Sequence, residues 1–334
     1  MIPYLQIPVH EPSQVGEARR AAARLSGELR LDETAAGRVA LIVTELAGNL
    51  ARHAQGGRIL LGCTPDGGLD VLSLDDGPGM ADVGECLRDG YSSAGTPGTG
   101  LGAARRLSSV FSVFSVAGKG TVIYAGVHAN PDAAEAAREP PAFCHAGINL
   151  AAPGEQVSGD GWQIRVNGRK VAVVVADGLG HGPDAAKASD AALAVFATAP
   201  AGAPSNLLER MHTALRSTRG AAVAVAELDD EIGTLKFAGS GNICGRLLSG
   251  VEDRALMSQH GTVGLQIRRP QDIGYAWPEH ALLILHSDGI VTRWNFAETP
   301  GLLQCEPAVV AGWLLREHCR GRDDATVVVL RRVR

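Results

Sequence analysis

The sequence lacks most of the features that mark secreted, membrane-spanning or zinc-binding proteins. Six cysteines are spread over 334 residues and no two of them form a C-x-x-C pair, which argues against a zinc site, a thioredoxin-like motif and a disulfide framework. No apolar stretch reaches the ~20 residues needed to span a bilayer. The opening residues, MIPYLQIPVHEP, have neither the basic start nor the apolar run of a signal peptide. We therefore expect a reduced, cytoplasmic protein without membrane attachment.

Basic clusters and aromatic residues are scarce as well. The formal net charge is −5 and there is no basic stripe or tail, so nucleic acid is not expected as the main partner. Aromatic residues make up only 4% of the chain, whereas Ala and Gly are abundant, and such small side chains favour close packing of helices on sheets. A hydrophobic fraction of 45% is enough for two ordinary cores, and the length fits two domains of ~150 residues each.

One segment has the composition of a linker. Residues 129–142, ANPDAAEAAREPPA, contain three prolines and few large apolar groups, which is typical of a connection between domains. We therefore predict a first domain at residues 1–128, a linker at 129–142 and a second domain at 143–334.

Hydrophobic periodicity and turn signals predict a mixed α/β structure in both halves. In the first half we expect a strand at Tyr4–Val9, helices at Gln14–Leu29 and Thr34–Ala54, strands at Arg58–Cys63 and Leu69–Leu74, a Gly-rich loop from Asp75 to Gly100, a helix at Leu101–Ser109, and strands at Phe111–Val116 and Thr121–Val127. In the second half we expect strands at Cys144–Ala151, Trp162–Val166, Val171–Ala176, Ala221–Asp229, Thr234–Ala238, Ile243–Leu248, Ala281–His286 and Ala325–Leu330, and helices at Pro183–Thr198, Ser205–Ser217 and Pro307–Cys319. Runs of strands with embedded helix pairs predict an α/β sandwich.

Three polar residues recur at steps of four along the second predicted helix. Glu45, Asn49 and His53 therefore share one helix face. A carboxylate beside a carboxamide would place a general base next to an oxygen ligand for Mg²⁺. The alternative is an ordinary polar stripe on an amphipathic helix.

Two glycine-containing motifs follow in an order that favours a nucleotide site. Residues 74–80 read L-D-D-G-P-G-M, which puts Asp75 at a strand end, where a buried carboxylate can accept a hydrogen bond from the amine of adenine. Residues 98–102 read G-T-G-L-G and precede a short predicted helix, whose first N–H groups would favour phosphate.

These segments resemble the ATPase superfamily of gyrase, heat-shock-90 chaperones, histidine kinases and MutL, and within it the anti-sigma-factor serine kinases of the RsbT type. The resemblance rests on T-E-L-A-G-N-L-A-R-H, D-D-G-P-G-M, G-T-G-L-G and G-K-G-T, with Tyr91-Ser92-Ser93 in support, and covers about residues 4–128. It implies a two-layer α/β sandwich of the GHKL type that binds ATP with Mg²⁺. No helical hairpin with a phosphoacceptor His precedes these segments, so a histidine kinase is not expected and His53 is expected to be structural.

The resemblance also implies a role for each motif residue. Glu45 is the expected catalytic base, Asn49 the magnesium ligand and Asp75 the reader of adenine, supported by Thr121. The residues expected to line the nucleotide and its lid are Gly77, Gly79, Gly98, Thr99, Gly100, Leu101 and Gly102.

In the second half, carboxylates stand at the ends of four predicted strands. The motifs are S-G-D at residues 158–160, D-G-L-G-H-G at 177–182, S-D-G at 287–289 and G-R-D-D-A-T at 321–326. Any single one of them fits a turn or cap residue. Together, carboxylates and carbonyls suit Mn²⁺ or Mg²⁺ rather than zinc, and a pair of such ions can activate a water for attack on a phosphoryl group.

The four motifs resemble the PP2C-type (PPM) phosphatases, in particular the bacterial SpoIIE and RsbX branch, over about residues 143–332. This implies a four-layer αββα sandwich in which Asp177 bridges a pair of Mn²⁺ or Mg²⁺ ions and the carbonyl of Gly178 completes one coordination shell. Asp288 and Asp323 would hold the second ion, and Asp160 would lie near the centre. Residues 158–163 read S-G-D-G-W-Q, without the second acidic residue of many relatives. His181 is expected either to contact substrate phosphate or to support its loop.

The combined expectation is a bifunctional enzyme that phosphorylates and dephosphorylates serine or threonine in a STAS-domain partner of a stressosome or another partner-switching pathway. Two alternatives stay open. Either the first half only senses ATP, or it is a binding switch that sequesters a sigma factor or activates a downstream effector without chemistry. The sequence does not specify the partner or the oligomeric state.

Overall fold

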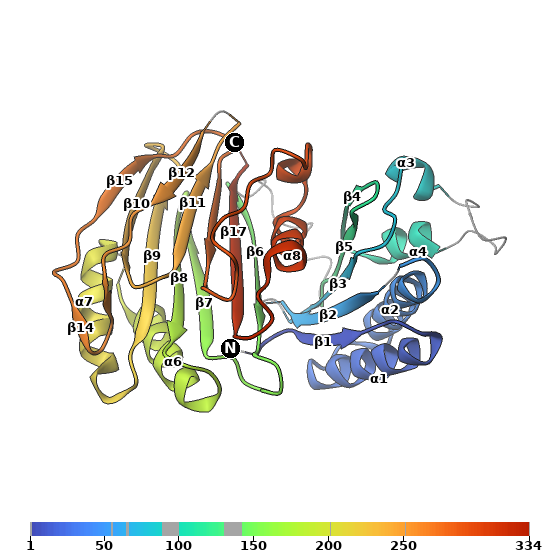
Figure 1. Ribbon diagram of the computed structural model, residues 1–334, viewed down its shortest axis with the longest axis horizontal. Coiled ribbons are helices and arrows are strands. Elements are labelled where there is room, and N and C mark those ends of the chain that lie inside the picture. Colours follow the sequence, from blue (N-terminus) through green and yellow to red (C-terminus); the bar gives the residue numbers. More distant parts are fainter. Residues whose placement is uncertain are drawn as a thin grey trace. The chain divides into compact units, whose positions relative to one another are not determined.

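The chain forms two compact units in the computed structural model. The structure describes residues 2–54, 56–64, 67–88, 100–129, 142–200, 202–250 and 252–333. One unit comprises Tyr4–Pro140 and Asn295–Arg316, and the other Met1–Pro3, Pro141–Trp294 and Glu317–Arg334. We call them the first unit and the second unit. Both mix helices with antiparallel sheets, so the predicted fold class is confirmed (Figure 1).

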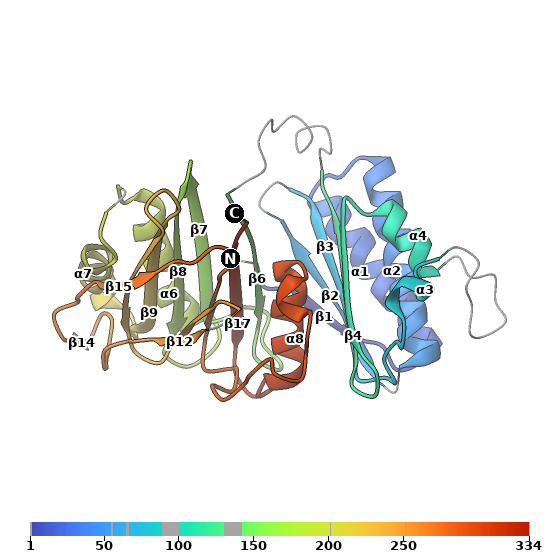
Figure 2. The ribbon, with the colours of Figure 1, turned by 90° about the horizontal axis from the view of Figure 1, so that it is seen from above.

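The first unit is built on a five-stranded antiparallel sheet with strand order β1-β2-β3-β5-β4. Its strands are β1 (Leu5–Pro8), β2 (Gly57–Cys63), β3 (Leu69–Asp75), β4 (Val110–Val116) and β5 (Gly120–Val127), and its helices are α1 (Pro12–Glu28), α2 (Glu33–His53), α3 (Val83–Cys86) and α4 (Gly100–Leu107). Helices α1 and α2 cover one face (Figure 2). Helix α2 begins where the Asp32 side chain accepts a hydrogen bond from the Ala35 N–H, and its apolar stripe, which includes Val39, Ile42 and Leu46, is fully buried in this core.

The opposite face of this sheet is apolar too, and a segment from late in the sequence lies on it. Leu60, Leu72 and Leu74 are at most 1% exposed. Helix α8 (Pro307–His318), preceded by the short helix η2 (Leu302–Gln304), packs here. A Cβ built on Gly312 would lie 3.1 Å from a methyl carbon of Leu72 and 3.2 Å from one of Leu74, so the helix approaches the sheet through a residue without a side chain.

The second unit is a sandwich of two five-stranded antiparallel sheets, ordered β15-β10-β9-β8-β7 and β12-β11-β16-β17-β6. The strands are β6 (Phe143–Leu150), β7 (Asp160–Asn167), β8 (Lys170–Gly178), β9 (Ala221–Asp229), β10 (Thr234–Ser240), β11 (Cys244–Leu248), β12 (Asp253–Leu256), β15 (Ile273–Ala276), β16 (Leu282–His286) and β17 (Ala325–Arg332), with a small hairpin of β13 (Gly261–Thr262) and β14 (Gln266–Ile267). Buried side chains from both sheets, such as Val173, Phe237, Leu285 and Val328, share one core between them. Helices α6 (Pro183–Thr198) and α7 (Pro204–Ala214), followed by η1 (Leu215–Ser217), cover the outer face of the first sheet.

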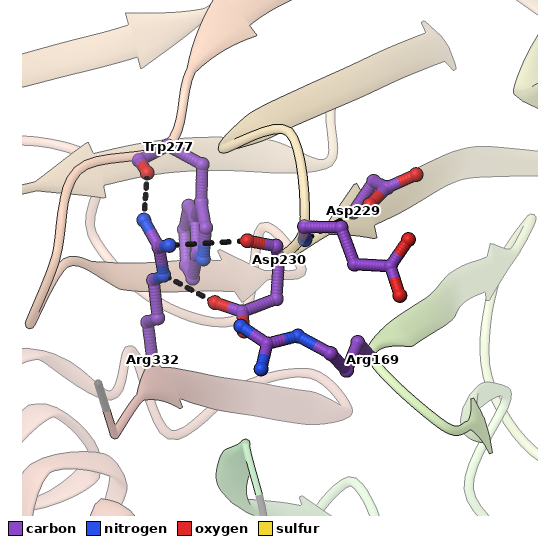
Figure 3. A network of polar contacts seen from close by, with 6 residues as sticks. Arg169, Asp229, Asp230, Trp277 and Arg332 are labelled. Carbon is purple, nitrogen blue, oxygen red and sulfur yellow. Dashed lines mark hydrogen bonds and ion pairs between the residues drawn. The ribbon is translucent and has the colours of Figure 1, made fainter.

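A buried polar network joins the two sheets at the end of β8 that lies away from Gly178 (Figure 3). The carboxylate of Asp230, in the turn after β9, accepts hydrogen bonds from Arg332 at the end of β17 and from Arg169. Arg332 also donates to the carbonyl of Trp277 at 2.6 Å. The Asp230 side chain is only 2% exposed, so these arginines are its partners in place of water.

The expected elements occur at their expected places, with three differences. The region expected as a loop after Asp75 contains the one-turn helix α3. Strands β7 and β8 are longer than expected, so that Asp160 begins one and Asp177 and Gly178 end the other. Strands β12 and β15, at the edges of their sheets, the β13–β14 hairpin and the short helix η2 were not predicted. Of the expected linker, residues 130–141 lie outside the described part of the chain. Among the helices that the structure describes, none is long and apolar enough to cross a membrane.

The Asp230 network should contribute strongly to stability. We expect Asp230→Ala to lower the free energy of unfolding by about 3 kcal/mol, because it leaves the Arg332 guanidinium, which is only 12% exposed, without its carboxylate. The thermal unfolding midpoint by circular dichroism measures this loss. Asp229→Ala is the matched control, since it removes the neighbouring carboxylate, whose partner Lys170 is 58% exposed. Equal midpoints for the two variants would contradict the prediction.

Candidate active sites

In the first unit, three of the expected site residues lie together. Glu45 and Asn49 stand one turn apart on α2, and both are partly exposed. Gly100, the first residue of α4, faces them: a Cβ built on it would lie 3.1 Å from Glu45 Oε2 and 3.7 Å from Asn49 Oδ1. Asn49 Oδ1 accepts a hydrogen bond from Arg52 Nη2 at 3.1 Å. A carboxylate, a carboxamide oxygen and a helix N-terminus therefore converge at one place.

Asp75 is held in a defined orientation at the end of β3. Its Oδ1 accepts a hydrogen bond from the Gly77 N–H at 2.8 Å, and Thr121 on β5 is its partner in the strand register. Thr121 is 5% exposed and its hydroxyl lies 3.0 Å from the Ser115 hydroxyl. Burial raises the pKa of Asp75, while the Gly77 N–H, the charge of Arg316 and the Thr121 N–H oppose that rise.

The other expected nucleotide residues are placed as follows. Gly79 has a φ of +68°, and a Cβ on it would collide with the carbonyl of Val116, so this turn requires glycine. Leu101 and Gly102 lie in the first turn of α4. Gly98 and Thr99, together with the Tyr91-Ser92-Ser93 segment, are outside the described residues. His53 is exposed at the end of α2.

In the second unit, strand register brings two of the expected metal ligands face to face. Asp160, the first residue of β7, is the direct partner of Asp177 near the end of β8. Gly178 follows at the same edge, and a Cβ on it would collide with the backbone of Ala185 on α6. Glycine is therefore required for the close approach of α6. This approach leaves the end of β8 tightly fixed.

The other two expected ligands come from the opposite sheet. Asp288 directly follows Ser287 after β16, and Asp323 stands two residues before β17. The Ser287 hydroxyl donates to Asp160 Oδ2 at 2.6 Å and accepts from the Thr326 N–H at 3.0 Å. These bonds tie the two sheets together within the candidate site.

The electrostatics of this site fit a divalent cation. Burial raises the pKa of Asp177, and the negative charges of Asp160, Asp288, Asp323 and Asp324 raise it further. The pKa of Asp160 is raised mainly by burial as well, with Asp324 and Asp288 adding to the effect. A buried excess of carboxylate charge is what Mg²⁺ or Mn²⁺ would neutralise, and oxygen donors are the ligands these ions prefer.

Carboxylates among the expected metal ligands accept hydrogen bonds from protein donors, and in the part of the chain that the structure describes they do not converge on one metal position. Within the described ranges, no three Asp, Glu, His or Cys side chains are grouped as metal ligands. Asp160 is held by Ser287, and Asp288 Oδ2 accepts a hydrogen bond from Asn242 Nδ2 at 2.7 Å. The donor chemistry therefore fits the ions, while the mutual geometry of the ligands is not that of a closed site.

Sequence reasoning missed several residues that build the site. Asp324 is 3% exposed, and its two carboxylate oxygens accept the N–H groups of Ala152 and Gly159, each at 2.8 Å. It thereby fixes the loop that leads to Asp160. The motif R-D-D contains both acidic residues, but nothing in the pattern tells which one turns inward. Ser287 and Asn242 belong to no charged motif and gave no signal.

A further buried residue, His286, precedes Ser287 and Asp288 in the chain. His286 is fully buried, its Nδ1 lies 2.8 Å from the Ser287 carbonyl, and its Nε2 accepts from Trp294 Nε1 at 3.1 Å. Burial is the main cause that lowers the pKa of His286, to about 4. The ring is therefore neutral, and its two nitrogens hold the Ser287 carbonyl and the Trp294 side chain in place. His181, by contrast, is exposed and lies 2.8 Å from Glu155 Oε1.

Comparison with known proteins finds a different family model in each half of the chain. The family model described as Stage II sporulation protein E (SpoIIE) matches residues 167–333, and that of a histidine kinase-like ATPase domain matches residues 9–126. The serine/threonine-protein kinase RsbT of Bacillus subtilis (strain 168) is 35% identical over 111 residues, which are 32% of this chain and 84% of RsbT.

Two solved structures resemble the chain over slightly more than half of its length. One, from work on the bacterial stressosome as a modular system adapted to control secondary messenger signaling, is 26% identical with a TM-score of 0.53 and covers 57% of this chain and 99% of its own. The other, RsbX in complex with magnesium, has a TM-score of 0.53 at 18% identity and covers 58% of this chain and 97% of its own, which shows a shared fold. The chain thus belongs to the SpoIIE family through a PP2C-type phosphatase domain, which follows a histidine kinase-like ATPase domain related to RsbT.

Proposed function

We propose that the chain is a bifunctional regulator that adds a phosphoryl group to serine or threonine of a STAS-domain protein and removes it again. The observation that carries the proposal is the register of β7 and β8, which sets Asp160 against Asp177 in a buried excess of negative charge. The likeness to RsbT and to a stressosome structure supports the kinase half and the class of partner. We place the two domains at residues 1–128 and 143–334, joined by 129–142, while residues 295–316 pack with the first.

In the phosphatase half, the residues proposed to hold a Mn²⁺ or Mg²⁺ pair are Asp160, Asp177, Asp288 and Asp323 with the Gly178 carbonyl. When bound, such a pair supplies a hydroxide nucleophile and neutralises phosphoryl charge. Asp177 is the proposed shared ligand. Asp324 and Ser287 keep the surrounding loops in place through the hydrogen bonds described above. The sequence has no Cys-x₅-Arg motif, so no cysteine nucleophile competes with this mechanism.

In the kinase half, the chain's own groups have distinct proposed tasks. Glu45 takes the proton from the substrate hydroxyl as that oxygen bonds to the γ-phosphorus and the bond to the ADP oxygen breaks. Asn49 holds Mg²⁺. Asp75 accepts the adenine amine. Gly100 leaves room for phosphate beside Glu45, because any side chain there would fill the space between α4 and α2.

The first prediction concerns the nucleotide site. Gly100→Ala should weaken Mg-ATP binding about tenfold, which corresponds to ~1.4 kcal/mol, because its Cβ would sit 3.1 Å from Glu45 Oε2. Stability should not fall, since Ala is the better helix former. Titration calorimetry measures binding. The control is Gly37→Ala on α2, where a Cβ meets nothing within 4 Å; unchanged binding in Gly100→Ala would contradict the assigned pocket.

The second prediction concerns the acidic centre. Asp177→Asn should reduce hydrolysis of a phosphoserine peptide by ~100-fold or more, since even partners of metal ligands are worth about 10–100-fold. A chelator should abolish the wild-type activity, and added Mn²⁺ or Mg²⁺ should restore it. Asp190→Asn, on the exposed part of α6, is the control and should behave as wild type. Activity that survives both the chelator and Asp177→Asn would refute the mechanism.

The third prediction concerns the shared substrate. With ATP and a purified STAS-domain protein, the phosphorylated partner should accumulate with Asp177→Asn and stay absent with Glu45→Ala, as quantified by intact-protein mass spectrometry. An ATP-sensing first domain would give no phosphopartner with any variant. A binding switch without chemistry would instead retain a partner complex in Glu45→Ala. Either result would replace the bifunctional proposal.

A further inference from the structure

Arg316, in the last turns of α8, is a buried arginine with an unusual set of partners. Its side chain is 2% exposed. Nη1 donates to the carbonyl of Asp75 at 2.6 Å and also to the carbonyl of Lys119. The same nitrogen lies 3.5 Å from a carboxylate oxygen of Asp76, a side chain that is 77% exposed. Two acceptors of the guanidinium are therefore main-chain carbonyls.

Those main-chain atoms belong to the candidate adenine site. Asp75 ends β3, and Lys119 stands in the turn just before β5, whose Thr121 pairs with Asp75. Between them lies Gly120, where a Cβ would collide with both the Asp75 carbonyl and the Arg316 guanidinium. One guanidinium thus joins the ends of β3 and β5 at the point where the Asp75 carboxylate is presented.

Arg316 is itself held in place. Its Cζ lies 4.1 Å from the centroid of the Trp313 ring, which meets Phe114 of β4 edge-on at 4.9 Å. From the sheet, Arg58 of β2 donates to the carbonyl of Leu315 at 3.2 Å. This carbonyl lies near the C-terminus of α8, where a positive charge is favourable. The Trp313 ring thus supports the guanidinium, while Arg58 holds the main chain of the helical turn that carries it.

Resting on the nucleotide site proposed above, we propose that Arg316 is a positioning residue for adenine recognition. It lies far outside residues 9–126, which match the ATPase-domain model, so recognition of the base depends on a helix that belongs in sequence to the phosphatase domain. By holding the Asp75 carbonyl, Arg316 sets the orientation from which the carboxylate and the Gly77 N–H meet the base. Its positive charge also lowers the pKa of that half-buried carboxylate against the rise that burial causes, which favours the ionised form as the acceptor for the adenine amine.

A purely structural role would also weaken nucleotide binding, so the test must separate the base from the rest of the nucleotide. The probes are Mg-ADP and the Mg complex of purine riboside 5′-diphosphate, which lacks the exocyclic amine. Calorimetry on the full chain gives the ratio of their dissociation constants. For the wild type we expect ADP to bind ~10-fold more tightly or better, because a hydrogen bond to a charged acceptor is lost with the analogue.

The variants are chosen to keep the packing of α8. Arg316→Met retains an unbranched stem over Trp313 and removes all donors, so its ratio should fall to between about 1 and 3. Arg316→Lys keeps a charge without the planar fork and should give an intermediate ratio. The matched control is Glu298→Gln, which breaks the ion pair to Lys119 at the same turn through a side chain that is 80% exposed. It should keep the wild-type ratio.

Each outcome decides between the readings. A ratio that falls in Arg316→Met and not in Glu298→Gln supports the positioning role. If both nucleotides weaken in parallel, so that the wild-type ratio persists in Arg316→Met and Arg316→Lys, the role is structural and the inference is overturned. If Arg316→Met does not fold, the Lys variant alone decides in the same way. If the wild type binds neither diphosphate, the proposed nucleotide site is itself wrong.

Discussion

A sheet that is apolar on both faces must be covered on both, and this constraint organises the first unit. Along β2, Ile59 and Leu61 point to the core under α1 and α2, while Leu60 between them is just as deeply buried on the other side. An antiparallel sheet more often leaves one face to water. Here helix α8, with every residue of Pro307–Leu315 buried, covers the second face. Residues 295–316 therefore belong to this unit, although they follow the β16 strand of the other.

In the second unit the main constraint is electrostatic, because several carboxylates lie close together in its acidic centre and repel one another. Carboxylates from both sheets raise the pKa of Asp177 together with burial, and donors such as Ser287 and Asn242 satisfy only part of them. Such an arrangement is costly for a purely structural site. Its persistence at the edge of an otherwise apolar sandwich is understandable if cations complete it. The polar network around Asp230 lies at the other end of β8, so its arginines do not neutralise this charge.

Much of both folds could be predicted from the sequence because local signals and the final structure agree. The helical periodicity over residues 34–54 and the strand-end acidic motifs both act over a few residues. The missed features depend on distant partners. Strands β12 and β15 exist because an edge is available to pair with, and the inward turn of Asp324 depends on the N–H groups of Ala152 and Gly159. Arg316 could not be found at all, since its acceptors are backbone carbonyls that carry no sequence signature.

Helix α8 stands where the chain passes from one unit to the other. The helix starts in the first unit, and its last two residues, Glu317 and His318, belong to the second. Asp323 follows five residues later. Under the proposed function, a shift of the Asp75 carbonyl on nucleotide binding would act on Arg316, which precedes the proposed cation ligand Asp323 by seven residues of chain. The coupling free energy between nucleotide binding and cation binding cannot exceed the change in the Asp75–Arg316 interaction, and such coupling free energies are about 1–3 kcal/mol. Linkage then requires that cation binding change nucleotide affinity by the same factor. A chain with the two proposed opposing activities would need such a bias, because without one it would only hydrolyse ATP.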